Sequence, residues 1–424
     1  MRPGGARPLP APERELSGVP GATVRQCAVL VGGLGTRLGA LTADTPKPIL
    51  PCGDRPFLAW LLREFVRFGV SEFLLLTGHL STRIEESLRA ITERLPVPAR
   101  IVLSEEPLRA GTGGAVFHAR DQLDARFLLC NGDSLFDCNL ARLLAAAAGD
   151  GGDVLGRVVL RRMRDASRYG VVELDGDRIT AFRERPGPGS PGLINGGVYL
   201  FDRRIVDSLA PQCSLEGEVM PRLAEQGALR GLPAEGYFRD IGIPEDLVRA
   251  RDELPTRMRR RALFLDRDGV INVDHGWVGT RERFEWIPGA IEAIRMATEA
   301  GWHVFVVTNQ SGVARGHYDE VAVGSLHAWM TDEIRRHGGT IDDIRYCPFH
   351  EEAVLPEYRR ASDWRKPEPG MILDLMRKWE LDPDLCVLVG DQPRDIEAAR
   401  AARIVGHLFP GGDLASFVEP ILRP

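Results

Sequence analysis

The chain has 424 residues, of which 44% are hydrophobic and 27% are charged, and its net charge is −6. This length favours two or three domains. The composition is that of a globular protein with an ample core, and it excludes collagen-like, coiled-coil, disordered and disulfide-scaffold chains. The small acidic excess gives no support for nucleic acid as a partner.

The cysteines and the N-terminus bear on the compartment. Seven scattered cysteines with no C-x-x-C pair favour a reducing environment. No apolar run approaches the roughly 18 residues that a membrane span needs. The Pro-, Gly- and Ala-rich N-terminus lacks the apolar core of a secretory signal. We therefore expect a cytoplasmic protein with no membrane partner and a disordered leader at residues 1–24.

The first half of the chain alternates buried strands with helices. Apolar runs at 27–31, 73–77 and 126–130 are typical of buried strands, and residues 57–68 have helical periodicity. This alternation predicts an α/β domain with a largely parallel sheet at residues 25–255. Residues 186–192 are rich in Pro and Gly and predict a loop.

A second α/β domain is predicted at residues 262–424. Its strands are expected at 262–265, 304–308, 386–389 and 404–408. A helical stretch at 244–253 and a basic segment precede it, so residues 256–261 are assigned as a linker. A nucleic-acid patch is the alternative for the basic segment, but within a short linker of an acidic protein a solvated connector is favoured.

A glycine-rich turn follows the first predicted strand, in the string Leu30-Val-Gly-Gly-Leu-Gly-Thr-Arg-Leu38, and Thr45-Pro-Lys-Pro48 comes after it. Glycines let backbone amides approach an anion and accept positive φ, and two cations lie where a triphosphate would be bound. The spacing matches neither the P-loop nor the dinucleotide fingerprint. The candidate nucleotide and phosphate ligands here are Gly32, Gly33, Gly35, Thr36, Arg37 and Lys47.

The string G-G-x-G-T-R-L followed by P-K-P resembles the signature of sugar-1-phosphate nucleotidyltransferases. Further segments resemble that family in the same order along roughly residues 25–255: Glu105 to Gly114, Asn131-Gly-Asp133, Glu184-Arg185-Pro186, Asn195 to Tyr199 and Arg239-Asp-Ile-Gly242. The resemblance implies a GT-A-like, Rossmann-like mixed sheet. It also implies base or ribose contact at Gly113, metal binding at Asp133 and Asp240, and sugar-phosphate or sugar contact at Glu184, Arg185 and Asn195. Arg185 stands where the family usually has lysine.

The reaction that this family catalyses explains the residue types. A sugar phosphate oxygen attacks the α-phosphorus of a nucleotide and pyrophosphate leaves, so that catalysis consists of positioning and electrostatic stabilisation. Asp133 and Asp240 together would hold Mg²⁺, while Arg37 and Lys47 would neutralise the pyrophosphate. Taken singly, each aspartate is better explained as a helix cap or turn residue, and only the order of the motifs together with the glycine turn favours metal binding.

Two aspartates directly follow the strand predicted at 262–265. Asp266, Asp268 and the glycine after them resemble the first motif of the haloacid dehalogenase (HAD) superfamily. The remaining motifs follow in order at Thr308-Asn309, Lys366 and Asp391. Only about 40 residues separate the first two motifs, so the resemblance implies a capless HAD-like Rossmannoid domain.

The resemblance also implies the roles of these residues. Asp266 would attack phosphorus to form an aspartyl-phosphate, and Asp268 would act as general acid and then general base. Mg²⁺ would be held by Asp266, Asp391 and the backbone carbonyl of Asp268. Thr308 and Lys366 would stabilise the phosphoryl oxygens, and Asn309 would contact the substrate.

Longer strings narrow the family. Asp266 to Val278, Thr308 to Gly316 and Trp364 to Met371 look like the D-glycero-D-manno-heptose 1,7-bisphosphate 7-phosphatases, and histidinol-phosphate phosphatases share part of them. The resemblance implies that Arg365 holds the distal phosphate and that Asp274 and His275 lie on a substrate-facing loop. A solvated loop position explains His275 equally well.

The chain departs from this family at its zinc loop. Phe349 replaces a histidine, and Ser362 and Trp364 stand in place of two cysteines. Because Cys347 and His350 alone cannot complete a tetrahedral site, we predict no zinc and a loop held by packing of Phe349 and Trp364.

Together the two halves predict a bifunctional enzyme of nucleotide-sugar synthesis for surface polysaccharide. The C-terminal domain would remove the 7-phosphate of the heptose bisphosphate, and the N-terminal domain would transfer a nucleotidyl group, expected to be GMP, to heptose 1-phosphate. The partners are then small sugar phosphates and a nucleoside triphosphate. One alternative keeps both chemistries with another sugar or nucleotide. The other fuses a regulatory sugar-nucleotide-binding domain to a histidinol-phosphate-type phosphatase. The oligomeric state stays open.

Overall fold

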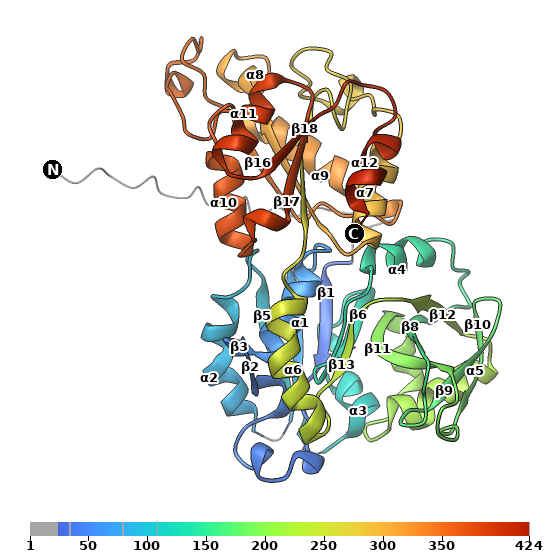
Figure 1. The fold of residues 1–424 in the computed structure, drawn as a ribbon. Helices are drawn as coiled ribbons and strands as arrows, with labels where there is room; N and C mark the ends of the chain where they lie inside the picture. Colours follow the sequence, from blue (N-terminus) through green and yellow to red (C-terminus); the bar gives the residue numbers. More distant parts are fainter. Residues whose placement is uncertain (1–23, 34, 79, 108, 424) are drawn as a thin grey trace.

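The computed structural model describes residues 24–33, 35–78, 80–107 and 109–423, which form two α/β domains (Figure 1). The C-terminal domain, yellow to red in Figure 1, is stacked on the N-terminal domain, blue to yellow-green. Residues 1–23 of the predicted leader lie outside the described residues. Among the described residues, no helix has both the length and the apolar character needed to cross a membrane.

The N-terminal domain is built on a nine-stranded mixed sheet with the order β5-β4-β1-β6-β11-β8-β12-β10-β9. The first four strands are parallel, and β11 is inserted antiparallel between β6 and β8. This confirms the expected mixed sheet. The strands are β1 (Gln26–Leu30), β4 (Glu72–Thr77), β5 (Arg100–Glu105), β6 (Arg126–Asn131), β8 (Gly156–Met163), β9 (Val171–Asp175), β10 (Arg178–Arg183), β11 (Gly192–Asp202) and β12 (Leu229–Ala234).

Helices cover both faces of this sheet, which is why its parallel strands are continuous apolar runs. Along β1, Cys27 and Val29 belong to one core and Ala28 to the other. Two short strand pairs complete the domain: β2 (Pro51–Cys52) with β3 (Arg55–Pro56), and β7 (Ser134–Phe136) with β13 (Phe238–Asp240). The helices are α1 (Phe57–Val66), α2 (Ser81–Thr92), α3 (Gly111–His118), α4 (Leu140–Ala147), α5 (Met220–Glu225) and α6 (Pro244–Arg257).

The C-terminal domain has a parallel five-stranded sheet with the order β16-β15-β14-β17-β18. The segment between β14 and β15 contains a loop, one short 3-10 helix and α7, in agreement with a capless fold. The strands are β14 (Ala262–Leu265), β15 (His303–Asn309), β16 (Asp343–Cys347), β17 (Cys386–Gly390) and β18 (Val405–Leu408). The helices are α7 (Ala290–Glu299), α8 (Ser311–Ala314), α9 (Glu320–Arg336), α10 (Gly370–Trp379), α11 (Pro393–Ala401) and α12 (Leu414–Leu422).

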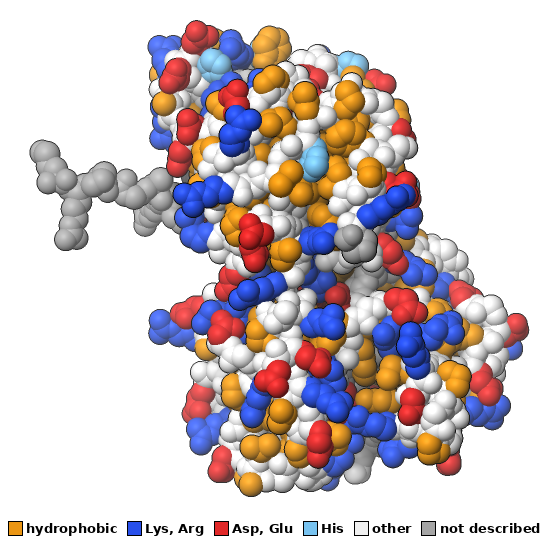
Figure 2. All heavy atoms as spheres, in the orientation of Figure 1, with side chains coloured by type: hydrophobic (Ala, Val, Ile, Leu, Met, Phe, Trp, Pro, Cys, Tyr) orange, Lys and Arg blue, Asp and Glu red, His pale blue; other side chains and the backbone are white. Residues whose placement is uncertain are grey.

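The basic segment between the domains is only in part the solvated connector that we expected, because Thr256, Arg257 and Arg259 are exposed but Met258 and Arg260 are buried. Helix α6 continues to Arg257, so that residues 256 and 257 are helical. Arg260 is only 7% exposed, and its guanidinium pairs with Glu64 of α1 and with Asp137. The expectation was wrong for Arg260 because it treated the segment as isolated, whereas the docked domains bury this side chain. Figure 2 shows basic and acidic side chains gathered along the constriction between the domains.

All seven cysteines are buried free thiols. Cys27 and Cys130, on neighbouring parallel strands, have their sulfur atoms 3.8 Å apart. Burial raises the pKa of the Cys27 thiol well above its ordinary value, which keeps it in the neutral form.

Candidate active sites

The glycine turn lies at the carboxyl end of β1. Gly35 has a φ of 63°, and a side chain there would contact Thr42, whose hydroxyl donates to the Gly35 carbonyl oxygen over 2.9 Å. A side chain at Gly32 would press against the backbone of Gly78. The turn therefore needs glycine at Gly35 for its backbone conformation and at Gly32 for close approach of two loops.

The predicted aspartates of this domain meet beside the turn. Pairing of β13 with β7 places Asp240 opposite Ser134, and the Ile241 amide donates to the Asp133 carbonyl oxygen over 2.9 Å. Lys47 Nζ lies 2.7 Å from Asp133 Oδ2. Burial, and then the charge of Asp133, raise the pKa of Asp240, whereas Lys47 and Arg37 lower it. Two neighbouring carboxylates of this kind suit a shared divalent cation.

A cavity of about 290 Å³ is lined in part by Asp133. The side-chain oxygen of Asn131 is buried there without a hydrogen-bond partner. Glu106 also faces the cavity, and its Oε2 accepts from the Ala110 amide over 3.2 Å. Burial raises the pKa of the Glu106 carboxyl. The lining further includes Gly32, Gly33, Lys47, Asp133, Arg109, Gly111, Thr112 and Glu216.

Some predicted ligands of this domain form hydrogen bonds within the protein, and their contact with substrate stays a prediction. The Gly113 amide donates to the Cys213 carbonyl oxygen, and a Cβ there would lie 2.6 Å from the Cys213 sulfur, so Gly111 and Thr112 line the cavity in its place. Asn195 Nδ2 donates to the Tyr199 hydroxyl, and its Oδ1 accepts from the Gly197 amide, which fixes a turn within β11. The remaining two predicted sugar contacts, Glu184 and Arg185, are exposed after the end of β10.

In the C-terminal domain, Asp266 follows β14 at the centre of the sheet and is 4% exposed. Lys366 Nζ lies 2.8 Å from Asp266 Oδ2 and 2.7 Å from Asp395 Oδ1, and it donates to the Val307 carbonyl oxygen over 2.9 Å. Burial raises the pKa of Asp266 to about 6, against the opposing effect of Lys366. The lysine therefore stabilises the charged form of the buried Asp266 carboxylate, which is the form that can act as a nucleophile.

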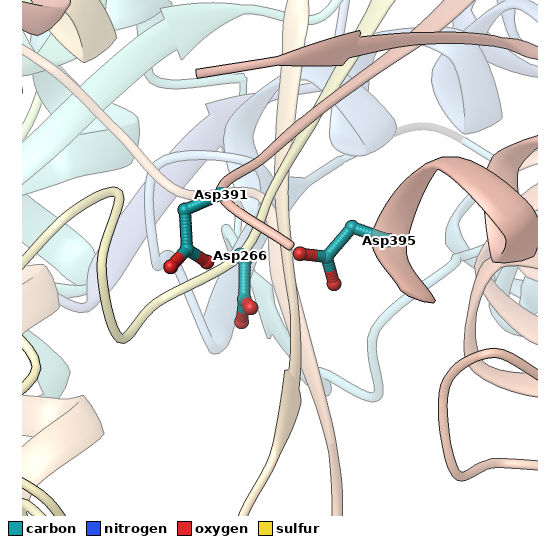
Figure 3. Close-up of side chains that lie close together, drawn as sticks. All are labelled: Asp266, Asp391 and Asp395. Carbon is teal, nitrogen blue, oxygen red and sulfur yellow. The ribbon is translucent and has the colours of Figure 1, made fainter. Parts of the chain in front are cut away.

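Three carboxylates from separate segments converge here (Figure 3). Oxygen atoms of Asp266, Asp391 and Asp395 lie within 4.8 Å of one another. Asp391 Oδ1 is buried without a hydrogen-bond partner, and a side chain at Gly269 would collide with the Asp391 carboxylate. A buried carboxylate oxygen without a partner, in an all-oxygen group, fits a hard divalent cation.

The sequence reading gave Asp395 no role. Its Oδ2 accepts from the Gln392 amide at the start of α11, and its Oδ1 pairs with Lys366. The sequence signal for this residue is the capping box of α11, formed by Gln392 and Asp395. It fixes the Asp395 carboxylate at the edge of the sheet where the motif strands end.

Asp268 lies outside this group, within a separate set of donors. Arg267, whose side chain is fully buried, donates to Asp268 through Nε and Nη2 over 2.8–3.2 Å. Asn272 Nδ2 and Gln310 Nε2 each donate to it over 2.9 Å. The two aspartates of the motif are thus held in different surroundings, as a nucleophile and a general acid require.

Three predicted substrate contacts make other bonds. Asn309 bonds the main chain of Lys366 twice, with its Nδ2 donating to the carbonyl oxygen and its Oδ1 accepting from the amide, each over 3.0 Å. Asp274 accepts from the Gly276 amide, and His275 Nε2 lies 2.8 Å from Glu285. Asn309 thus positions Lys366, while Asp274 and His275 fix their own loop.

Arg365 lies among other cations. Burial, and the charges of Arg394 and Arg315, lower its pKa against the opposing effect of Cys347 and Glu351. Within the described part of the chain, none of these three arginines forms an ion pair with a carboxylate. Like charges left together in this way are typical of an anion-binding site.

The loop that departs from the zinc pattern packs as expected. Phe349 and Trp364 lie against the core on the α10 and α11 side of the sheet, and Arg360 stacks on the Phe349 ring at 3.7 Å. His350 Nδ1 accepts from the Glu352 amide. The absence of zinc stays a prediction.

The two halves of the chain resemble different known proteins. Residues 27–257 match the nucleotidyl transferase family, and residues 363–413 match the HAD-hydrolase-like family. The chain is 52% identical over 164 residues to the D-glycero-beta-D-manno-heptose-1,7-bisphosphate 7-phosphatase of Rhodopseudomonas palustris, which covers 39% of this chain and 91% of that protein. The enzyme of the same name from Escherichia coli strain K12 is 43% identical over 143 residues, or 34% of this chain and 75% of that protein.

Among solved structures, the crystal structure of HddC from Yersinia pseudotuberculosis is 27% identical, with a TM-score of 0.49, and covers 55% of this chain and 100% of that one. The family match in the first half spans more than half of the chain, and the relatives in the second half are covered over most of their length. The chain therefore belongs to the nucleotidyl transferase family through residues 27–257 and to the D-glycero-beta-D-manno-heptose-1,7-bisphosphate 7-phosphatase family through its C-terminal domain.

Proposed function

We propose that this chain carries out two successive reactions on one sugar. The C-terminal site removes the 7-phosphate of D-glycero-D-manno-heptose 1,7-bisphosphate, and the N-terminal site joins the resulting heptose 1-phosphate to GMP from GTP, releasing pyrophosphate. The observation that carries the proposal is that one chain holds both a phosphatase site, at Asp266 and Lys366, and a segment of the nucleotidyl transferase family. Arg365, next to Lys366, has no carboxylate within ion-pair distance among the described residues and is the candidate contact for a second phosphate. Both reactions would take place in the cytoplasm.

The arginines beside the phosphatase site support a bisphosphate substrate. The charges of Arg315 and Arg394 act on Arg365, as does that of Glu351, and Arg394 is next to Asp395 in the sequence. A substrate with a single phosphate would place it at Asp266 and leave these cations without a partner. A second phosphate would satisfy them with charge-assisted hydrogen bonds.

Glu106 supports guanine as the base. The Watson–Crick edge of guanine presents two neighbouring donors, N1–H and the N2 amino group, which a carboxylate can accept together. Uracil and cytosine do not offer this pair of donors, and adenine has an acceptor at N1. A carboxylate in the cavity at the end of β4 and β5 therefore favours GTP over the other three nucleotides.

Mg²⁺ is the proposed ion in both sites. Asp133 and Asp240 would hold it in the first domain, and Asp266 and Asp391 with the Asp268 carbonyl oxygen in the second. When bound, the ion would neutralise the charge that builds on the phosphate oxygens. Carboxylates and carbonyl oxygens are the hard ligands that it prefers.

The residues of the phosphatase site would divide the reaction into two steps. An Asp266 oxygen attacks phosphorus, the bond from phosphorus to the sugar oxygen breaks, and Asp268 gives its proton to that oxygen. Water then attacks the aspartyl-phosphate, Asp268 takes a proton from the water, and the bond to Asp266 breaks to release phosphate. Lys366 and Thr308 stabilise the charge on the phosphoryl oxygens in both steps.

The test incubates the full chain with the bisphosphate, Mg²⁺ and each of the four nucleoside triphosphates in turn. We expect one phosphate per sugar in every reaction, and pyrophosphate with a nucleotide sugar only with GTP. Phosphate release without any nucleotide sugar would contradict the transferase half. Nucleotide-sugar formation from mannose 1-phosphate in preference to heptose 1-phosphate would contradict the choice of sugar.

A further inference from the structure

Gln310 connects two residues of the phosphatase reaction. This residue directly follows β15 and is 1% exposed. Nε2 donates one hydrogen to Asp268 Oδ2 and the other to Thr308 Oγ1, each over 2.9 Å. Oε1 accepts from the Tyr318 hydroxyl over 2.8 Å. We propose that Gln310 is a positioning residue that aligns both the general acid and the phosphoryl-stabilising hydroxyl, and that Tyr318 fixes the orientation of its amide. This inference rests on the phosphatase chemistry proposed above.

The surroundings of Asp268 determine which way the amide faces. Arg267 and Asn272 already donate to the Asp268 carboxylate, so a carbonyl oxygen turned toward it would bring two acceptors together. The Tyr318 ring lies against Gly279 and Gly312, where a side chain on either glycine would collide with it. The hydroxyl is thereby held at Oε1, and the amino group is left for Asp268 and Thr308.

The bond to Thr308 has a consequence for the phosphoryl group. A hydroxyl has one hydrogen and can also accept. Because Thr308 accepts from Gln310, its own hydrogen remains available to donate to a phosphoryl oxygen. Gln310 thus directs Thr308 toward the substrate, and it holds Asp268 at the position from which a proton reaches the leaving oxygen.

The effect of Gln310 on Thr308 and its effect on Asp268 can be told apart by comparing substrates with different leaving groups. Loss of alignment at Thr308 slows every phosphate ester alike, because the phosphoryl group is the same. Misplacement of Asp268 slows esters with basic leaving groups most, since these need the proton, and affects good leaving groups least. A change in leaving-group dependence therefore reports on Asp268, and a merely structural role for Gln310 would not produce it.

The test uses the full chain with Mg²⁺ and a series of substituted phenyl phosphates. Gln310→Met keeps the side-chain length and removes both hydrogen-bond donors. General acid catalysis contributes about 10²–10⁴-fold, so we expect kcat to fall on the order of 100-fold for phenyl phosphate and less than about tenfold for 4-nitrophenyl phosphate, with KM nearly unchanged. Tyr318→Phe should change the dependence of kcat on the leaving group in the same direction but by less. Gln226→Met, at an exposed position in the other domain, is the matched control.

Equal losses across the series for Gln310→Met, or wild-type behaviour of both variants, would overturn the inference. Tyr318→Phe keeps the test valid if Gln310→Met does not fold, because it removes a single oxygen. Hydrolysis of the aryl esters but not of the heptose bisphosphate by the wild-type chain would contradict the proposed substrate alone. Failure of the wild-type chain on every ester would overturn both proposals.

Discussion

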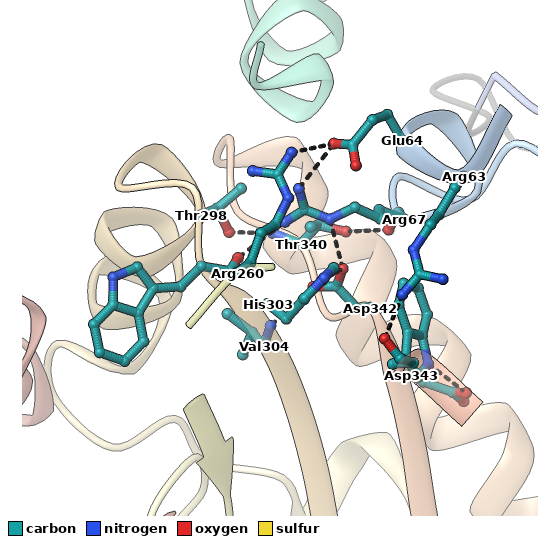
Figure 4. A network of polar contacts seen from close by, with 12 residues as sticks. Arg63, Glu64, Arg67, Arg260, Thr298, His303, Val304, Thr340, Asp342 and Asp343 are labelled. Carbon is teal, nitrogen blue, oxygen red and sulfur yellow. Dashed lines mark hydrogen bonds and ion pairs between the residues drawn. The ribbon is translucent and has the colours of Figure 1, made fainter. Parts of the chain in front are cut away.

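Arg67 at the end of α1 and Asp342 just before β16 form an ion pair of 2.7 Å between the two domains, with their side chains 2% and 0% exposed (Figure 4). Asp342 also accepts from His303 Nδ1 and from the Val304 amide, and Arg67 donates to the Trp302 carbonyl oxygen. A buried ion pair whose charged groups also form hydrogen bonds fixes the relative position of the two segments that hold it. The domains are therefore docked as one unit.

Arg67→Ala should destabilise the protein strongly, because it leaves the Asp342 carboxylate buried without its guanidinium partner. Breaking a buried pair costs about 3–5 kcal/mol in the free energy of unfolding. Urea denaturation monitored by tryptophan fluorescence would measure this. The control is Arg83→Ala, which removes an exposed pair with Glu86 and should cost less than about 1 kcal/mol. Equal effects of the two variants would contradict the interface assigned here.

Stability should fall as the solution becomes acidic, because of His303. Burial lowers the pKa of His303 to about 3, so the folded chain keeps it neutral while the unfolded chain protonates it below pH 6.5. Asp342 adds to the loss below about pH 4, since Arg67 and His303 hold its pKa well below its usual range despite burial. From pH 6.5 downward the unfolded state binds more protons, and His303 alone removes up to about 1.4 kcal/mol per pH unit.

His303→Gln keeps a donor toward Asp342 and removes the titration. Melting temperatures measured between pH 7 and pH 4 should therefore fall less steeply in this variant than in the wild type. The same slope in both proteins would show that His303 does not control the acid sensitivity of the interface.

Arg394→Ala should weaken binding of a bisphosphate and leave the chemical step intact. One charge-assisted hydrogen bond is worth about 1.5–3 kcal/mol, so KM for the heptose bisphosphate should rise about 10- to 100-fold. With 4-nitrophenyl phosphate, which has no second phosphate, kcat and KM should both stay near their wild-type values. A matched loss on both substrates would place Arg394 in the support of Asp395 rather than in substrate binding.

Glu106→Gln should reduce the preference for GTP. The amide offers one acceptor and one donor where the guanine edge needs two acceptors, and a good bidentate contact discriminates by about 1–3 kcal/mol. The ratio of kcat/KM for GTP to that for ATP should therefore fall about 10- to 100-fold, measured as pyrophosphate release with heptose 1-phosphate. An unchanged ratio would show that other groups select the base.

The two sites should exchange their intermediate through solvent. The domain interface includes residues just before the amino ends of strands, such as Trp302 before β15 and Asp342 before β16, which both contact Arg67. The two sites lie at carboxyl ends instead, since the glycine turn follows β1 and Asp266 follows β14. A mixture of the full-length variants Asp133→Asn and Asp266→Asn should then make nucleotide sugar as fast as the wild type at equal concentrations of each active site. A much slower mixture would indicate direct transfer within one chain.

Both families, the order of their motifs and most strand positions could be read from the sequence, because each motif is a local pattern. The strand predicted at 262–265 and the aspartate after it agree with β14. Asn309 and Gly113 show what a local pattern leaves out. Asn309 bonds the main chain of Lys366, 57 residues away, and the Gly113 amide donates to the Cys213 carbonyl oxygen. Neither partner can be inferred from spacing.

The sequence by itself determined the chemistry: two aspartates after a buried strand, a glycine turn with cations behind it, and the distances along the chain between motifs. Tertiary structure alone decided which donors surround each carboxylate. It placed Asp395 on Lys366, Gln310 between Asp268 and Thr308, and Arg260 in a buried network instead of in solvent. The physical reason is that hydrogen bonds and ion pairs depend on distances in space, and residues far apart in the chain meet only when the sheets and helices have packed.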